Sequence, residues 1–197
     1  SIAMGIVPSG GAIGWFLSTL LLSMFLATLS VMTLLQTKPH LKIELTSAPL
    51  LLAVTVLLQS FVEEVLFRVY LMNKIFRRFF NSEILLCFCS AAFFSLAHLL
   101  NYRMSEGVSL SPAPLLFLFL IGFAGSGLYL RQGHILGAWG FHAGWNAVRF
   151  AVVLLSDGNR VAESMTFELL EGSWLCLGLS GGLVALSLIH QRRRTRP

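Results

Sequence analysis

The sequence predicts an all-α fold, a polytopic bundle of about six transmembrane helices around an intramembrane polar cavity. Hydrophobic residues make up 56% of the 197 residues and charged residues only 12%, about half the charged share of a typical soluble domain. The mean hydropathy of +0.79 agrees with this composition. The apolar runs are also continuous and do not alternate with a period of two, which excludes a transmembrane β-barrel.

Six apolar runs are candidate spans, since a helix needs about 20 apolar residues to cross a hydrocarbon core of about 30 Å. The second run begins at Pro49, which suits the first turn of a helix, and Pro112 and Pro114 precede the fourth. No repeat, low-complexity segment or linker divides the chain, so residues 1–197 are expected to form a single domain. The expected spans are 13–35, 49–75, 84–100, 114–130, 135–155 and 174–189.

The distribution of Lys and Arg predicts the orientation of the bundle. With both termini in the cytoplasm, the inner segments hold eight Lys and Arg residues and the outer loops hold four, as the positive-inside rule requires. The net charge of +5 is thereby explained by topology, which argues against a nucleic-acid partner. The cysteines indicate neither a disulfide framework nor a Cys-based zinc site, because Cys87, Cys89 and Cys176 all lie in expected spans.

Two adjacent carboxylates in the second apolar run are the first candidates for function. An ionisable side chain at membrane depth is costly unless it is paired, and so indicates a functional site. Glu64 and Arg68 are four residues apart and can form an ion pair on one helix face. Glu63 points about 100° away from Glu64 and must find another partner. We interpret Glu63 as functional and the Glu64–Arg68 pair as structural.

Three polar residues on other spans could face Glu63. His98 lies near the end of the third run, and His142 and Asn146 lie four residues apart in the fifth, so that both project from one helix face. Ala143 and Gly144 are small enough to let another helix approach closely. Taken singly, His98 could be a core residue, and His142 with Asn146 could be interhelical hydrogen-bonding residues. Together the groups predict one shared site.

These residues form three motifs, in order and on separate expected helices: Glu63-Glu64-x-x-x-Arg68, Phe94-x-x-x-His98 and His142-x-x-x-Asn146. This arrangement resembles the CPBP family of intramembrane proteases, which includes the type II CAAX prenyl endopeptidases and the bacterial Abi proteins. The resemblance covers roughly residues 49–155. It implies an intramembrane endopeptidase of the glutamate type with its active site in an intramembrane cavity, in the plasma membrane of a bacterium or archaeon.

The resemblance also implies a role for each motif residue. Glu63 and His98 would activate a water molecule, and His142 and Asn146 would stabilise the oxyanion. Glu64 and Arg68 would be the supporting pair. No cofactor is expected, and the substrate would be a membrane-anchored peptide or protein, lipidated or C-terminally anchored.

Elementary chemistry agrees with the implied activity and leaves alternatives open. A Glu beside a His can polarise water and then return the proton, and two donors one helical turn apart can hold one oxyanion. Glu63, His98 and His142 are the alternative zinc ligands. A small proton-coupled transporter or channel could use the same Glu/His cluster, although the sequence shows no inverted repeat. The third alternative is a catalytically silent chaperone or immunity protein on a protease fold.

Overall fold

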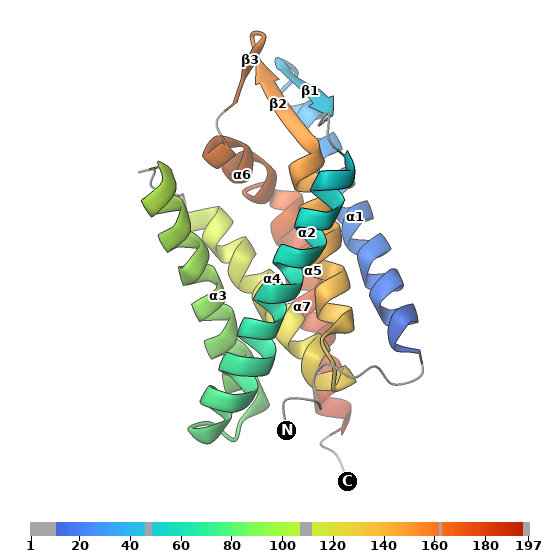
Figure 1. Ribbon diagram of the computed structural model, residues 1–197, viewed down its shortest axis with the longest axis vertical. Coiled ribbons are helices and arrows are strands. Elements are labelled where there is room, and N and C mark those ends of the chain that lie inside the picture. Colours follow the sequence, from blue (N-terminus) through green and yellow to red (C-terminus); the bar gives the residue numbers. More distant parts are fainter. Residues whose placement is uncertain (1–10, 46–48, 107–111, 162, 195–197) are drawn as a thin grey trace.

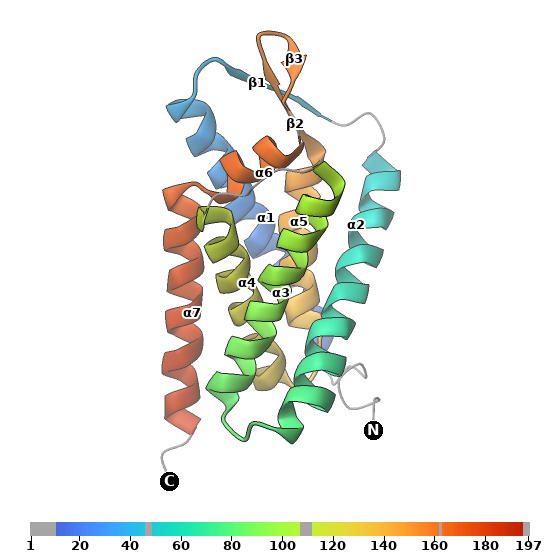
Figure 2. The same ribbon diagram turned by 90° about the vertical axis from the view of Figure 1, so that its left-hand side faces the viewer.

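The computed structural model describes residues 11–45, 49–106, 112–161 and 163–194. Long helices run side by side, and a small sheet covers one end of the bundle (Figures 1 and 2). The helices are α1 Ala12–Thr37, α2 Pro49–Glu64, α3 Glu83–Glu106, α4 Pro112–Gln132, α5 Leu136–Ala151, α6 Glu163–Glu171 and α7 Trp174–Arg194. A π-helix, η2 (Val65–Ile75), and a short 3₁₀ turn, η3 (Phe76–Arg78), continue α2. The strands are β1 Leu41–Leu45, β2 Val152–Ser156 and β3 Asn159–Arg160.

Four helical segments in the described part of the chain are long and apolar enough to cross a membrane. They agree with the first four expected spans and are Ala12–Thr37, Pro49–Arg78, Glu83–Leu100 and Pro112–Gln132. The span in α4 is the central one, because 61% of its apolar window is buried against 22–39% in the other three. A further apolar stretch, Leu175–Val184 in α7, is shorter.

The fifth expected span ends earlier than the sequence analysis placed it. Helix α5 stops at Ala151, and the four residues assigned to the end of that span belong to β2. Val152 and Val153 open the strand, and β-branched residues favour extended backbone over helix. Helix α5 is therefore 16 residues long, or about 24 Å.

The sheet was not expected in an all-α fold. Strand β2 pairs with β1 in antiparallel register from Leu41↔Ser156 to Leu45↔Val152. It then turns back into β3 through Asp157 and Gly158, whose φ values of 52° and 80° suit the tight hairpin that Asp-Gly favours. Strands β1 and β3 and helix α6 lie where the sequence analysis expected loops, and β2, which replaces the end of the fifth expected span, directly extends the helix that carries His142 and Asn146 (Figure 2).

Helices α1 and α5 pack closely through two glycines one turn apart. A Cβ atom on Gly140 would collide with the backbone carbonyl of Phe16, and one on Gly144 would collide with that of Leu20. Small residues at this spacing let helix backbones approach within a membrane. Helix α1 is therefore the close neighbour that the small residues of the fifth run predict, and it fixes the position of α5.

Candidate active site

Three of the expected site residues converge from three different helices. The Oε2 atom of Glu63, near the end of α2, lies 3.6 Å from Nε2 of His98 on α3 and 3.7 Å from Nε2 of His142 on α5. These separations are just beyond direct hydrogen bonds, as is common in catalytic sites without substrate. The side chains of Glu63 and His98 are 19% and 21% exposed, whereas the Oε2 atom of Glu63 is itself buried.

Glu64 is buried and joins two partners. Its Oε2 faces Nε of Arg68 at 3.1 Å, with both side chains at most 2% exposed, so the predicted i,i+4 ion pair is present. Its Oε1 lies 3.0 Å from Nδ1 of His142. An ionised carboxylate can only accept, so this contact assigns the proton of His142 to Nδ1. The Nε2 atom of a neutral His142 is then left as an acceptor facing Glu63.

His98 is held in the same tautomer by a different partner. Its Nδ1 lies 2.9 Å from the carbonyl oxygen of Phe94, one turn earlier on α3, and a carbonyl can only accept. The Phe94 ring lies 4.4 Å from the ring of His98 and 5.5 Å from that of His142, centroid to centroid. Both imidazoles thus direct Nε2 at the same carboxylate oxygen of Glu63.

Arg68 is fully surrounded by groups that suit a buried guanidinium. Its Nη1 donates to Oγ of Ser90 at 3.1 Å, and Ser90 in turn donates to the carbonyl of Phe67 at 3.2 Å. The guanidinium carbon lies 5.3 Å from the centre of the Phe94 ring, a cation–π distance. On the other side α4 presents Gly125, where a Cβ atom would stand 3.0 Å from Nη2. The arrangement holds Arg68, and through it Glu64, in one position.

Sequence reasoning missed three residues around this centre. Ser90 and Gly125 contact Arg68, but serine and glycine are ordinary in membrane helices, so neither carries a signal of its own. Gln59 donates from Nε2 to Oε1 of Glu63 at 3.1 Å. Its amide lies one turn before Glu63 in an apolar run, and this i,i+4 spacing could have identified it.

Asn146 follows His142 by one turn on α5 and is 8% exposed. It lies on the same helix face, as its spacing predicts. Among the contacts of the described residues, no hydrogen bond joins its amide to Glu63, His98 or His142. Of the six residues named from the sequence, the structure therefore joins five by direct contacts or close approach and places Asn146 beside them.

The zinc alternative of the sequence analysis stays untested by the side-chain arrangement. Within the residues that the structure describes, no three His, Cys, Asp or Glu side chains form a group that could hold a metal ion. A hydrogen bond from His142 Nδ1 to a carboxylate would also suit a metal ligand, so that contact alone does not separate the two chemistries.

Comparison with known proteins identifies the family. No curated protein and no solved structure matches the chain. A family model described as type II CAAX prenyl endopeptidase Rce1-like matches residues 45–148, more than half of the chain, and this segment contains all six predicted site residues. The four membrane-length helices agree with an integral membrane protein. The chain therefore belongs to the Rce1-like family of type II CAAX prenyl endopeptidases, which are proteases.

Proposed function

We propose that this protein is an intramembrane endopeptidase that uses Glu63 as its general base. The observation that carries the proposal is the placement of Oε2 of Glu63, a side chain that is 19% exposed, between the Nε2 atoms of His98 and His142. General bases must be within reach of the proton that they remove, so the proposal requires that a water molecule and the peptide carbonyl approach Glu63 from its exposed side.

Water activation is the first step. Glu63, assisted by the Nε2 acceptor of His98, takes a proton from the water as its oxygen bonds to the carbonyl carbon. The carbonyl oxygen becomes an oxyanion. The proton then passes from Glu63 to the amine nitrogen as the carbon–nitrogen bond breaks, leaving one new carboxylic acid and one new amine. Transfer of the acid's proton to the amine then gives a carboxylate and an ammonium group. No serine or cysteine nucleophile is required.

The oxyanion is stabilised from α5. Asn146 supplies side-chain N–H donors, and His142 supplies an Nε2–H donor when both of its ring nitrogens are protonated. The buried carboxylate of Glu64 lies 3.0 Å from Nδ1 and holds the imidazole with Nε2 toward Glu63. Loss of one such donor typically lowers the rate by about 100-fold or more, which sets the expected size of the Asn146→Ala effect.

The substrate is a membrane-anchored peptide or protein, lipidated or C-terminally anchored. The family acts on prenylated and membrane-bound proteins, and exposed apolar side chains such as Val62 and Leu66 (62% and 45% exposed) flank the glutamates on the outer face of the helix. A lipid-anchored segment can therefore reach Glu63 along an apolar surface. The topology that accompanies this proposal has six spans, with α5 and α7 as the last two, and both termini in the cytoplasm.

The decisive experiment compares Glu63→Gln with wild type in proteoliposomes that contain fluorogenic peptides, prenylated and unprenylated. The amide keeps the shape but not the base, so cleavage should fall to background while the melting temperature is retained. The matched control is Glu83→Gln, which removes an exposed carboxylate in the first turn of α3 and should leave cleavage unchanged. Full activity of Glu63→Gln would end the proposal, and proton flux without cleavage in wild type would favour the transporter.

Metal removal tests the preferred chemistry against the zinc alternative. Prolonged treatment with 1,10-phenanthroline, followed by measurement of bound zinc and of cleavage, should leave activity intact. Loss of cleavage that added Zn²⁺ restores would instead assign Glu63, His98 and His142 as zinc ligands.

A further inference from the structure

A second buried carboxylate lies outside the group that carries the proposed chemistry. Glu171 ends α6 and is 1% exposed. Its Oε1 accepts the indole N–H of Trp145 at 2.8 Å and lies 3.6 Å from Nε of Arg149. A buried carboxylate is costly unless it is paired, so its retention at the end of a short helix calls for a reason.

Both partners of Glu171 belong to the functional face of α5. Trp145 and Arg149 follow His142 by three and seven residues, and residues at these spacings are neighbours on one side of a helix. Asn146 lies beside Trp145 in sequence and one turn beyond His142. The charge of His142 also acts on Glu171, which places the two groups in the same electrostatic neighbourhood.

Two buried carboxylates therefore hold the part of α5 that contains Asn146. Glu64 on α2 bonds to His142 at 3.0 Å, and Glu171 on α6 bonds to Trp145 and faces Arg149. Asn146 follows Trp145 directly and lies between His142 and Arg149 in the sequence of α5. A rotation of α5 about its axis would break one or both of them, so together they fix the direction in which the Asn146 amide points.

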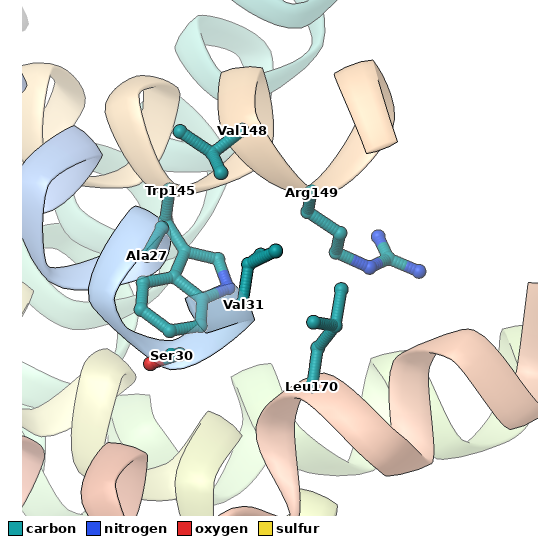
Figure 3. Close-up of a pocket in the computed structure, with 7 residues that line it drawn as sticks. All are labelled: Ala27, Ser30, Val31, Trp145, Val148, Arg149 and Leu170. Carbon is teal, nitrogen blue, oxygen red and sulfur yellow. The ribbon is translucent and has the colours of Figure 1, made fainter. Parts of the chain in front are cut away.

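The surroundings of Trp145 are otherwise apolar and tightly packed. Its ring stacks against Phe117 with centroids 4.7 Å apart. It also borders a pocket of about 10 Å³, room for about one water molecule. Figure 3 shows Trp145 and Arg149 reaching from α5 toward the segment that carries Leu170, the residue before Glu171. Of the contacts that the structure describes here, the bond to Glu171 is the one that orients the indole.

We propose that Glu171 is a positioning residue of the protease, which acts through Trp145 and Arg149 to hold the α5 segment that presents Asn146 and His142 to the substrate. The inference rests on the proposed function, because it assigns Glu171 to the same reaction. The inference adds a residue that lies outside the matched family segment 45–148. It also assigns α6 the role of supporting the site residues on α5.

The first test compares Glu171→Leu with Glu171→Gln. Leucine removes the acceptor, so kcat should fall by about tenfold or more, since small displacements of catalytic groups are this costly, while KM stays within about twofold. Glutamine keeps an oxygen acceptor for the indole and should restore most of kcat. The control is Glu168→Leu, one turn earlier on α6 and only half-buried, which should match wild type. A merely structural role would lower the melting temperature of Glu171→Leu and leave kcat unchanged, and that result would overturn the inference.

The second test can still refute the role of Glu171 if the Glu171→Leu variant does not fold. Trp145→Phe preserves the aromatic packing and removes the donor, and it is combined in a double-mutant cycle on kcat with Glu171→Met, which removes the acceptor but nearly keeps the length of the side chain. The losses of kcat in the two single variants should not add in the double variant, because each change breaks the same attachment. Additive losses of kcat would refute the proposed role of Glu171. If Glu63→Gln is inactive while Glu171→Leu and Trp145→Phe are fully active, the role of Glu171 is refuted and the proposed function stands. If Glu63→Gln is active, the proposed function itself is refuted.

Discussion

The two adjacent glutamates lie in different environments, although they are neighbours in sequence. Glu64 is 2% exposed and bonded to Arg68 and His142, whereas Glu63 is 19% exposed and faces two imidazole nitrogens. The i,i+4 spacing predicted the Glu64–Arg68 pair, and the structure confirms it. The bond from Glu64 to His142 was not predictable, because it joins residues 78 positions apart and depends on how α2 packs against α5.

Arg68→Leu tests the structural half of this division. It leaves Glu64 as a buried charge with one partner fewer, so the free energy of unfolding should fall by about 3–5 kcal/mol, and cleavage should fall with it. Glu64→Gln combined with Arg68→Leu leaves no lone charge and should recover part of that stability. Glu63→Gln, in contrast, should melt at or above the wild-type temperature, since groups held for function often cost stability.

Melting temperatures in detergent, together with cleavage rates, check all three variants. The assignment of the two glutamates would be reversed if Glu63→Gln melted far below wild type while Glu64→Gln alone lost only activity.

Glu171 predicts a specific dependence of stability on pH. Burial raises the pKa of this carboxyl to about 7, and it outweighs the opposing effects of Arg149 and the Trp145 hydrogen bond. Between pH 4.5 and 7 the folded state therefore binds this proton more tightly than the unfolded state does, so the contribution of Glu171 to stability decreases as pH rises through that window. The charged and titratable groups facing Glu171 are Arg149, His142 and the thiol of Cys176.

The measurement is the melting temperature from pH 5 to pH 8 for wild type, Glu171→Gln and Glu168→Gln. Wild type and Glu168→Gln should lose several degrees relative to Glu171→Gln as pH rises to 7, and the difference should then level off. Parallel curves for all three proteins would contradict the buried position of Glu171.

At the scale of elements, the contact between α1 and α5 determines where two of the site residues lie. The sequence predicted that small residues on the fifth run would admit another helix, but not which one, because the choice of partner depends on the whole packing arrangement. The structure assigns α1, through Gly140 and Gly144. The π-helical η2 was equally beyond prediction, although wide helical turns often occur at functional sites.

Gly144→Ala should separate these two helices. The added Cβ atom meets the backbone carbonyl of Leu20 and the Ser23 hydroxyl, and overpacking of this kind typically costs about 1–3 kcal/mol. Cleavage should also fall, because His142 and Asn146 move with α5. Gly178→Ala on α7 is the control, since a Cβ atom there meets nothing within 4 Å. Equal melting temperatures and activities for the two variants would show that the α1–α5 contact is looser than described.

At the scale of the whole molecule, features that are local in the sequence were predicted correctly. Features that depend on contacts between segments far apart in the sequence were not predicted. Continuous apolar runs located the four membrane-length helices, and the ordered motifs pointed to the family. The β1–β2 pairing was not predicted because its strands are separated by more than 100 residues. The sequence of β2 also resembles the end of an apolar span. Glu171 was not predicted as a site residue because, in the sequence, it is one of several acidic residues between two expected spans.

The length of α1 has a consequence for the lipid that the protein needs. Its 26 residues contain no charged side chain and extend about 39 Å, against a hydrocarbon core of about 30 Å. Such hydrophobic mismatch is relieved by tilting or by local thickening of the bilayer. Because α1 is locked to α5 at Gly140 and Gly144, a change in its tilt is passed to His142 and Asn146.

The cleavage rate should therefore depend on the acyl-chain length of the surrounding lipid. In phosphatidylcholine vesicles with chains from 14 to 22 carbons, cleavage should peak in the thicker bilayers and decline in the thinnest. Gly144→Ala should respond less to thickness than Gly178→Ala, since it loosens the link between the two helices. A flat profile for wild type would show that the tilt of α1 does not reach the site, whereas a peaked one would make the thickness of the host membrane part of the enzyme's regulation.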